Sequence, residues 1–156
     1  MKLQPLVSLS SKALPQFLNV GPTKDKIVLC HGVFDLIHPG HIEHLKQARA
    51  MGDVLVVTIT ADKFVNKGPG RPVFTQEQRA SHLASLEMVD YVAIVDAPTA
   101  LPAIEIIKPA VYVKGPDYEG RNTPNFLAEC ALVRKYGGEV RITSGFTSSS
   151  SALING

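Results

Sequence analysis

Two histidines set three residues apart mark the part of the chain best suited to chemistry. His38 and His41 belong to the stretch HGVFDLIHPGH, residues 31–41, whose histidines, glycines and proline are poor core material. At that spacing two imidazoles on a helix are neighbours, and their N–H groups can donate to phosphate oxygens that gain charge during phosphoryl transfer. Pro39 suits a first helical turn, and Gly40 lets a backbone or a ligand approach closely. The stretch therefore predicts an anion site at the start of a helix.

The residues on either side predict the elements that hold this turn. Residues 27–30 form a short apolar run typical of a buried strand, and from about Gly40 to Met51 apolar residues recur at helical spacing. The turn between them carries neither a G-x-G-x-x-G nor a P-loop pattern. We therefore expect the free amides of the helix N-terminus and the two histidines to hold the anion together.

Short apolar runs alternate with amphipathic segments along the rest of the chain. We expect strands at residues 27–31, 54–60, 91–95, 111–113 and 140–143, and helices at residues 40–51, 75–86, 99–107 and 124–136. Such alternation predicts the α/β class, with helices covering both faces of a parallel sheet. We expect a Rossmann-like, doubly wound, five-stranded parallel sheet of strand order 3-2-1-4-5, with the site where the first and fourth strands diverge.

Charge, hydropathy and cysteine usage exclude several classes of partner. Sixteen basic and 14 acidic residues give a net charge of +2 without a basic run, so no nucleic-acid partner is expected. No stretch approaches the roughly 18 apolar residues of a membrane span, so no membrane partner is expected either. Cys30 and Cys130 fall in apolar segments and are interpreted as core fillers in a reducing compartment, which predicts a cytoplasmic protein.

The chain divides into a leader and one domain. Residues 1–25 show no strong period and are predicted to be an N-terminal leader, with a short helix from Ser10 or Ser11 to Leu18. Residues 26–156 are predicted to form one functional domain. Because residues 152–156 look like an interrupted helix start, we expect this domain to be part of a longer polypeptide.

Five segments of the chain resemble those of one enzyme superfamily. GVFDLIHPGH resembles the H-x-G-H signature of the nucleotidyltransferases, in their cytidylyltransferase-like branch. KGPGRP, EQR, VDYV and VKGPDY, at residues 67–72, 77–79, 89–92 and 113–118, resemble segments of the heptose 1-phosphate adenylyltransferase domain. The resemblance covers about residues 26–155 in family order. It implies transfer of a nucleoside monophosphate from ATP or CTP to a phosphorylated sugar or polyol, with release of pyrophosphate.

The resemblance also implies a cofactor, an assembly and residue roles. Mg²⁺ would be bound with the nucleotide phosphates rather than by the protein alone, and the chain would form a homodimer or be fused to a kinase-type domain. Catalysis would involve His38, His41 and Lys67. Nucleotide binding would involve Val33, Phe34, Gly40, Arg79, Lys114, Ser149, Ser150 and Ser151, with Arg79 among the phosphate clamps. Acceptor binding would involve Asp35, Arg71, Asp117 and Tyr118.

Other functions stay open for the whole chain. A cytidylyltransferase acting on a polyol, amino-alcohol or phosphonate acceptor fits the same branch. A catalytically silent, nucleotide-binding regulatory module fits the same fold, although mere binding would tolerate loss of the His38 and His41 pair.

Other interpretations stay open for individual residues. Cys30, His31 and His44 stand near the histidine pair, and together they offer nitrogen and sulfur ligands for Zn²⁺. Otherwise His44 and His82 are expected to be ordinary helix-surface residues. Lys67 and Arg71 could be solvated loop charges, and residues 148–151 could be a flexible tail. Residues 61–74, which hold two glycines and two prolines, are expected to form a lid that orders when triphosphate binds.

Overall fold

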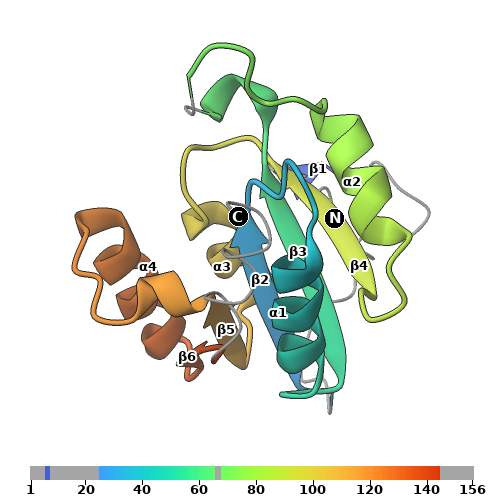
Figure 1. Ribbon diagram of the computed structural model, residues 1–156. Helices are drawn as coiled ribbons and strands as arrows, with labels where there is room; N and C mark the ends of the chain where they lie inside the picture. Colours follow the sequence, from blue (N-terminus) through green and yellow to red (C-terminus); the bar gives the residue numbers. More distant parts are fainter. Residues whose placement is uncertain (1–5, 8–24, 66–67, 145–156) are drawn as a thin grey trace.

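A six-stranded sheet lies between two layers of helices in the computed structural model, which describes residues 6–7, 25–65 and 68–144 (Figure 1). The strands are β1 (Leu6–Val7), β2 (Ile27–Gly32), β3 (Val54–Thr60), β4 (Tyr91–Val95), β5 (Val111–Lys114) and β6 (Glu139–Ile142). The α-helices are α1 (Pro39–Arg49), α2 (Gln76–Ala84), α3 (Leu101–Ile107) and α4 (Pro124–Lys135). Two short 3₁₀ helices, η2 (Asp62–Phe64) and η3 (Pro116–Tyr118), follow β3 and β5.

The sheet has the order β1-β4-β3-β2-β5-β6. Strands β2 to β6 pair in parallel throughout, and numbered along the chain they stand in the order 3-2-1-4-5. This confirms the predicted doubly wound sheet. β1 adds an edge strand that was not predicted, antiparallel to β4. It lies within the predicted leader, whose expected helix from Ser10 or Ser11 to Leu18 is outside the described residues.

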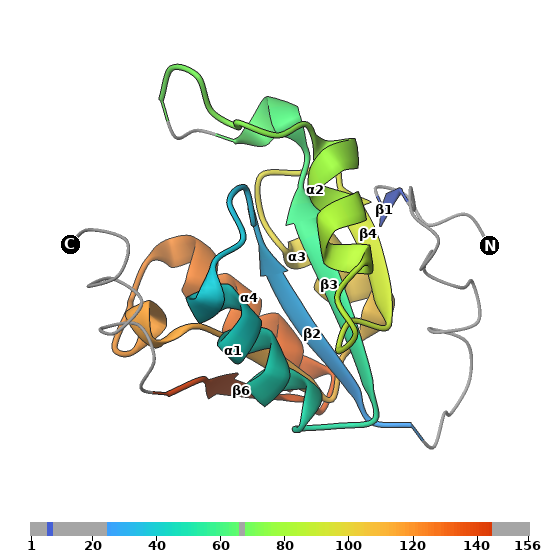
Figure 2. The same cartoon turned by 45° about the vertical axis from the view of Figure 1, so that its right-hand side comes forward.

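Each face of the sheet is covered by its own pair of helices. Helices α1 and α2 pack on one face against side chains such as Val28 and Val57, and α3 and α4 pack on the other against side chains such as Leu29 and Val56. Figure 2 shows α1 and α2 together on the near face. Because side chains alternate along a strand, β2 supplies both cores, and its residues from Ile27 to Cys30 are almost completely buried.

Local sequence signals explain where the helices begin. The Thr75 hydroxyl accepts a hydrogen bond from Gln78 N, and the Gln78 side chain accepts one from Thr75 N, which forms a capping box at the start of α2. A proline occupies one of the first two positions of α1, α3 and α4, where its missing N–H costs nothing.

Both cysteines are buried, as expected of core fillers. Among the described residues, no helix is both long and apolar enough to cross a bilayer.

The carboxyl ends of the central strands deliver the chain to one edge of the sheet. β2 ends at Gly32 immediately before the histidine turn, β3 ends at Thr60 before η2, and β5 ends at Lys114 before η3. Parallel strands present these ends on the same side. β2 and β5 are the neighbouring strands from which the chain builds the sheet outward in opposite directions. The fold therefore gathers three loops around the start of α1.

Candidate active site

The backbone between β2 and α1 turns sharply at Phe34. This residue has φ +51°, in the left-handed region, and its ring is buried. The ring folds back over Gly32, where a Cβ atom would lie 3.0 Å from Phe34 Cε2. The absence of a side chain at Gly32 therefore leaves room for the Phe34 ring. Phe34 also meets His41 edge-on, with ring centroids 5.5 Å apart, so the turn and the first turn of α1 form one packed unit.

His38 and His41 together cap the N-terminus of α1. His38 has an extended backbone, and its Nδ1 accepts a hydrogen bond from Gly40 N at 3.1 Å. His41 Nδ1 in turn accepts one from His38 N at 3.3 Å, which makes a capping box from two imidazoles. The rings lie against each other with centroids 3.9 Å apart and planes 33° apart. The histidines that the sequence singled out therefore stand side by side at a helix start.

The two caps decide which ring nitrogen can donate to a ligand. A nitrogen that accepts a backbone N–H must carry a lone pair, so the network assigns the hydrogen of each neutral imidazole to Nε2. His38 and His41 thus each present an Nε2–H donor beside the amides and the positive dipole end of α1. Such an arrangement suits an anion, because oxygens accept hydrogen bonds from every one of these groups.

Asp35 fastens a later segment of the chain to the turn. Its buried carboxylate accepts hydrogen bonds from Arg71 Nε at 2.8 Å, Val73 N at 2.7 Å and Phe74 N at 2.9 Å. Burial alone raises the pKa of Asp35, but the bonds from Phe74 and Val73 and the Arg71 guanidinium together lower it below its ordinary value. Asp35 is therefore an ionised tether, and it places the Arg71 side chain, which is 33% exposed, beside the histidine turn.

Arg79 is fully buried beneath the turn. Its Nη1 donates to Val33 O at 2.9 Å and Thr60 O at 2.8 Å, its Nε donates to Phe74 O, and its Nη2 donates to Asp62 Oδ1 at 2.7 Å. These acceptors belong to the turn, the end of β3, the segment before α2, and η2. The resemblance implied that Arg79 is a phosphate clamp, whereas in this structure its side chain is 0% exposed and bonded to the protein's own oxygens.

Lys114 brings a positive charge to the place where β2 and β5 diverge. It is 6% exposed, and its Nζ donates to His31 O at 2.8 Å. The same Nζ lies 4.4 Å from the centroid of the Tyr118 ring, while the Arg121 guanidinium lies 4.2 Å from it. Asp117 is largely exposed, with a carboxylate oxygen 3.8 Å from Arg121. η3 is thus wrapped around a buried cation.

His31, the first histidine of the stretch, belongs to the core. Its Nδ1 hydrogen-bonds Thr58 Oγ1 at 2.8 Å, and its Nε2 lies 3.3 Å from Thr60 Oγ1. Burial, with a smaller effect of the Lys114 charge, lowers the pKa of His31 to about 3. The residue is therefore a neutral, hydrogen-bonded support behind the site.

His44 is not the ordinary helix-surface residue that was expected. It is partly buried, and its Nδ1 hydrogen-bonds Thr143 Oγ1 at 2.8 Å. Burial and then the Lys114 charge lower the pKa of His44 to about 4, against an opposing effect of Asp117. The expectation was wrong because helical spacing does not tell which loop packs over a position. His82 is exposed as expected, and its ring meets Phe74 edge-on.

Comparison with known sequences identifies the family. The sequence model of the family described as Cytidylyltransferase-like matches residues 29–148. This chain belongs to the cytidylyltransferase-like family. The match runs from β2 past the end of β6, so it includes the histidine turn, the Asp35 tether and Lys114.

Relatives of this cytidylyltransferase-like chain include long proteins of which it matches one part. The bifunctional protein HldE of Geobacter metallireducens is 44% identical over 121 residues, which are 76% of this chain and 24% of that protein. The protein of the same name from Aliarcobacter butzleri is 50% identical over 99 residues, 62% of this chain and 21% of that protein. The chain spans about a quarter of the length of these curated relatives.

Two solved structures share the cytidylyltransferase-like chain's fold. A lipopolysaccharide core biosynthesis protein from Thermoplasma volcanium superposes with a TM-score of 0.66 at 24% identity, covering 78% of this chain and 98% of that one. A pantoate-beta-alanine ligase from Francisella tularensis superposes with a TM-score of 0.58 at 19% identity, covering 96% and 73%. At these identities the likeness concerns the fold alone.

The described residues bring most of the predicted site together. The turn supplies Val33, Phe34, Asp35 and the histidine pair, the Asp35 tether adds Arg71, and Lys114 with Tyr118 follows the neighbouring strand. Lys67, Ser149, Ser150 and Ser151 lie outside the described residues of the cytidylyltransferase-like chain. Within the described part, no three histidine, cysteine, aspartate or glutamate side chains gather as a metal-binding group.

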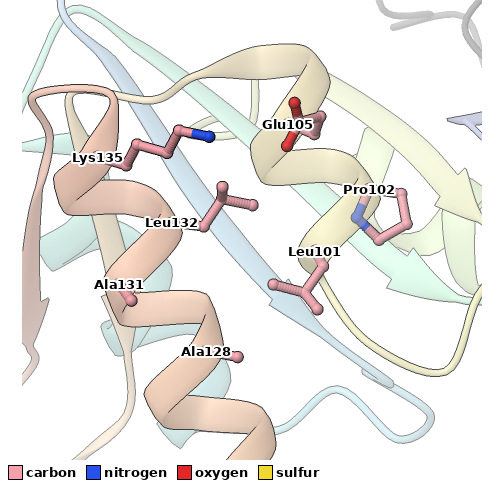
Figure 3. Close-up of a pocket in the computed structure, with 7 residues that line it drawn as sticks. All are labelled: Leu101, Pro102, Glu105, Ala128, Ala131, Leu132 and Lys135. Carbon is pink, nitrogen blue, oxygen red and sulfur yellow. The ribbon is translucent and has the colours of Figure 1, made fainter.

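A larger hollow lies away from this chemistry. A groove of about 620 Å³ runs between α3 and α4 and is mostly apolar (Figure 3). It is lined by Leu101, Pro102, Glu105, Ala128, Ala131, Leu132 and Lys135. A hollow of about 490 Å³ includes His38 and Pro39 at the start of α1. We place the candidate site of this cytidylyltransferase-like chain at α1, because the donors and cations gather there.

Proposed function

We propose that this chain transfers adenylate from ATP to a phosphorylated sugar and releases pyrophosphate. The main support is the pair of His38 and His41, whose rings lie against each other and whose Nε2–H donors stand at the N-terminus of α1. A phosphate oxygen of the acceptor would attack the α-phosphorus in line. The new P–O bond forms as the bond from that phosphorus to the bridging oxygen breaks, and pyrophosphate departs with the electron pair. No protein nucleophile is required.

Each group around the turn has a distinct part in such a reaction. The two histidines would donate to α-phosphate oxygens, which gain charge as the phosphorus becomes pentacoordinate, so their effect belongs mainly to the transition state. Arg71, which lies in the loop that Asp35 tethers, would attract the phosphates. Lys114 would set a positive potential where β2 and β5 diverge. Arg79 would act indirectly, by holding the Val33 carbonyl and hence the shape of the turn.

Mg²⁺ fits this scheme as a companion of the nucleotide. At the turn, the Asp35 carboxylate already accepts three N–H groups, and the other residues are donors and cations, so the described side chains suit phosphate oxygens better than a metal ion. The ion would be held by the triphosphate itself and would neutralise the departing pyrophosphate.

The choice of ATP and a sugar phosphate rests on the resemblance to the heptose 1-phosphate adenylyltransferase domain. A homodimer or a fusion to a kinase-type domain, and a cytoplasmic location, stay predictions. Light scattering of the purified chain tests whether it forms a homodimer.

The deciding experiment measures pyrophosphate release from ATP and from CTP, each with heptose 1-phosphate and with glycerol 3-phosphate. We expect ATP with the sugar phosphate to give the highest rate. His38→Asn tests the donor itself, because asparagine keeps a good helix N-cap but lacks the Nε2–H group. It should lower kcat by roughly 10²- to 10³-fold, as removal of an oxyanion donor does, with little change in nucleotide KM.

The other outcomes are equally informative. A higher rate with CTP and a polyol phosphate would replace the adenylyltransferase by a cytidylyltransferase. Thermal stabilisation by nucleotide without any pyrophosphate would identify a regulatory module; a ligand at 100 times its dissociation constant stabilises by about 2.7 kcal/mol. Stoichiometric zinc in the purified protein would reject a phosphate role for the histidines.

A further inference from the structure

A row of polar side chains continues along α1 beyond the two capping histidines. His44 and Gln47 follow His41 at three-residue steps, so each is a neighbour of the one before it. The row winds around the helix and reaches the chain that leaves β6. Leu45 and Ala48 lie on the buried side of the same turns and pack against β2 and β3. One helix thus carries the candidate catalytic pair at its start and two further polar contacts behind it.

His44 and Gln47 form hydrogen bonds with the two residues that follow β6. Gln47 Nε2 donates to Ser144 O at 3.2 Å, and Ser144 N donates to Gln47 Oε1 at 3.0 Å, so the side-chain amide pairs with the backbone in both directions. His44 Nδ1 lies 2.8 Å from Thr143 Oγ1. Between them these bonds tie positions nearly a hundred residues apart.

Thr143 also forms hydrogen bonds with Lys114, the buried cation of the site. Its N donates to Lys114 O at 2.9 Å, and its hydroxyl donates to the same oxygen at 3.4 Å. Lys114 Nζ bonds to the carbonyl of His31, one residue before the end of β2. With the hydroxyl hydrogen of Thr143 directed to Lys114 O, the shared hydrogen of the His44 contact belongs to Nδ1. This tautomer is opposite to that of His38 and His41.

We propose that His44 and Gln47 are positioning residues that fasten the exit of β6 to α1 and thereby fix His38 and His41 relative to Lys114. Apolar packing holds α1 on β2 and β3, whereas His44 and Gln47 hold α1 to the exit of β6 through hydrogen bonds. Loss of these bonds would leave the core in place but let the start of the helix shift against the cation. A displacement of about 1 Å at a reacting centre can cost 10²-fold in rate. The inference rests on the proposed nucleotidyl transfer.

The kinetic test compares four variants of the full chain. His44→Leu and Gln47→Leu remove the polar contact at similar size, His44→Asn keeps a donor near the Nδ1 position, and Lys46→Ala changes an exposed neighbour on the same helix. We expect each leucine variant to lower kcat by roughly 10- to 100-fold with nucleotide KM changed less than about threefold. His44→Asn should recover most of the rate, and Lys46→Ala should match the parent.

A double variant separates positioning from general weakening of the fold. If His44 acts through His41, His44→Leu should lower kcat much less in a His41→Ala background than in the parent, because the donor to be positioned is gone. Multiplicative effects in the double variant, or leucine variants with the parental kcat, would overturn the proposal.

A spectroscopic test keeps the fastening distinct from the activity. Imidazole ¹⁵N shifts should report the Nδ1–H tautomer for His44, and Thr143→Val should change that signal. An unchanged signal in Thr143→Val would overturn the fastening. A parent protein that releases no pyrophosphate would reject the proposed function and with it the catalytic consequence, while the tautomer measurement would still decide the contact.

Discussion

The imidazoles of His38 and His41 differ from those of His31 and His44 in what surrounds the second ring nitrogen. In the capping pair, Nδ1 is taken by a backbone amide and Nε2–H is the donor. In His31 both nitrogens lie within hydrogen-bond distance of threonine hydroxyls. The side-chain type is the same, yet only the capping pair couples a helix N-terminus to a donor.

This difference makes a prediction for substitutions at His41. His41→Gln keeps an N–H donor at a reach similar to Nε2, whereas His41→Asn keeps an acceptor near the position of Nδ1 and has no donor at that reach. We expect His41→Gln to retain a kcat at least tenfold above that of His41→Asn, since one missing donor costs roughly 10² to 10³. Single-turnover rates at saturating ATP and acceptor measure this. Equal rates in the two variants would contradict donation from Nε2.

The position of His38 and His41 could be predicted from the sequence, because spacing and residue type suffice to place two donors at a helix start. The sequence could not predict the roles of Arg79 and His44, because those depend on segments far away in the chain. The acceptors of Arg79 come from the histidine turn, the end of β3, η2 and the segment before α2, and the partner of His44 is Thr143, 99 residues on. A polar residue on a helix has the same periodicity whether water or a loop covers it.

Arg79 offers a test between support of the turn and direct binding of phosphate. Arg79→Lys keeps the charge but cannot reach four acceptors, and it leaves buried carbonyls without donors. We expect the free energy of unfolding to fall on the order of 3 kcal/mol in urea titrations. Arg49→Lys, at a partly exposed ion pair with Asp90, is the control and should change it far less. Unchanged stability with lost triphosphate affinity would restore the clamp role.

At the scale of elements, the parallel strands were the most predictable part of the fold. The predicted bounds of β3 and β4 match the observed ones, because each is a continuous run of β-branched and apolar residues. The two-residue β1 was missed, since Leu6–Val7 shows no period that could separate a strand from a loop. The 3₁₀ helices after β3 and β5 are too short to carry a periodic signal.

The segment before α2 provides a prediction about an element's attachment. Asp35→Ala removes the acceptor of Val73 N and Phe74 N, so both amides should exchange with solvent at least about tenfold faster, as local opening becomes cheaper. Hydrogen exchange read by mass spectrometry over residues 68–75 measures this. Asp117→Ala, a change at a largely exposed carboxylate, is the control. Unaltered exchange in Asp35→Ala would show that the segment is held by other contacts.

At the scale of the whole molecule, the sheet face toward α3 and α4 carries buried polar groups as well as apolar packing. Tyr112 donates from its hydroxyl to Glu129 Oε1 at 2.7 Å, and Ala100 N donates to Glu129 Oε2, so the carboxylate joins β5, α4 and the start of α3. His31 and Lys114 lie on strands of the same sheet. Buried groups of this kind make stability depend on their protonation, because an uncompensated charge in the interior is costly.

Acidification should therefore destabilise the protein before its ordinary carboxylates titrate. The pKa of His31 is lowered to about 3 and that of His44 to about 4, from an ordinary value of 6.5. Between these values the unfolded chain binds more protons than the folded one. The contribution of these two histidines to the free energy of unfolding is therefore fully present above about pH 6.5. It is lost as the pH falls toward their folded-state pKa values. Each such histidine contributes a slope of at most about 1.4 kcal/mol per pH unit.

Urea unfolding at intervals from pH 7.5 to 4.5 measures this dependence. We expect the free energy of unfolding to decrease steadily below pH 6.5. His44→Asn removes one of the two titrating groups, so its curve should fall less steeply over the same range even if its stability at pH 7.5 is lower. A flat profile in the parent between pH 6.5 and 4.5 would mean that these two imidazoles are not held neutral by the fold.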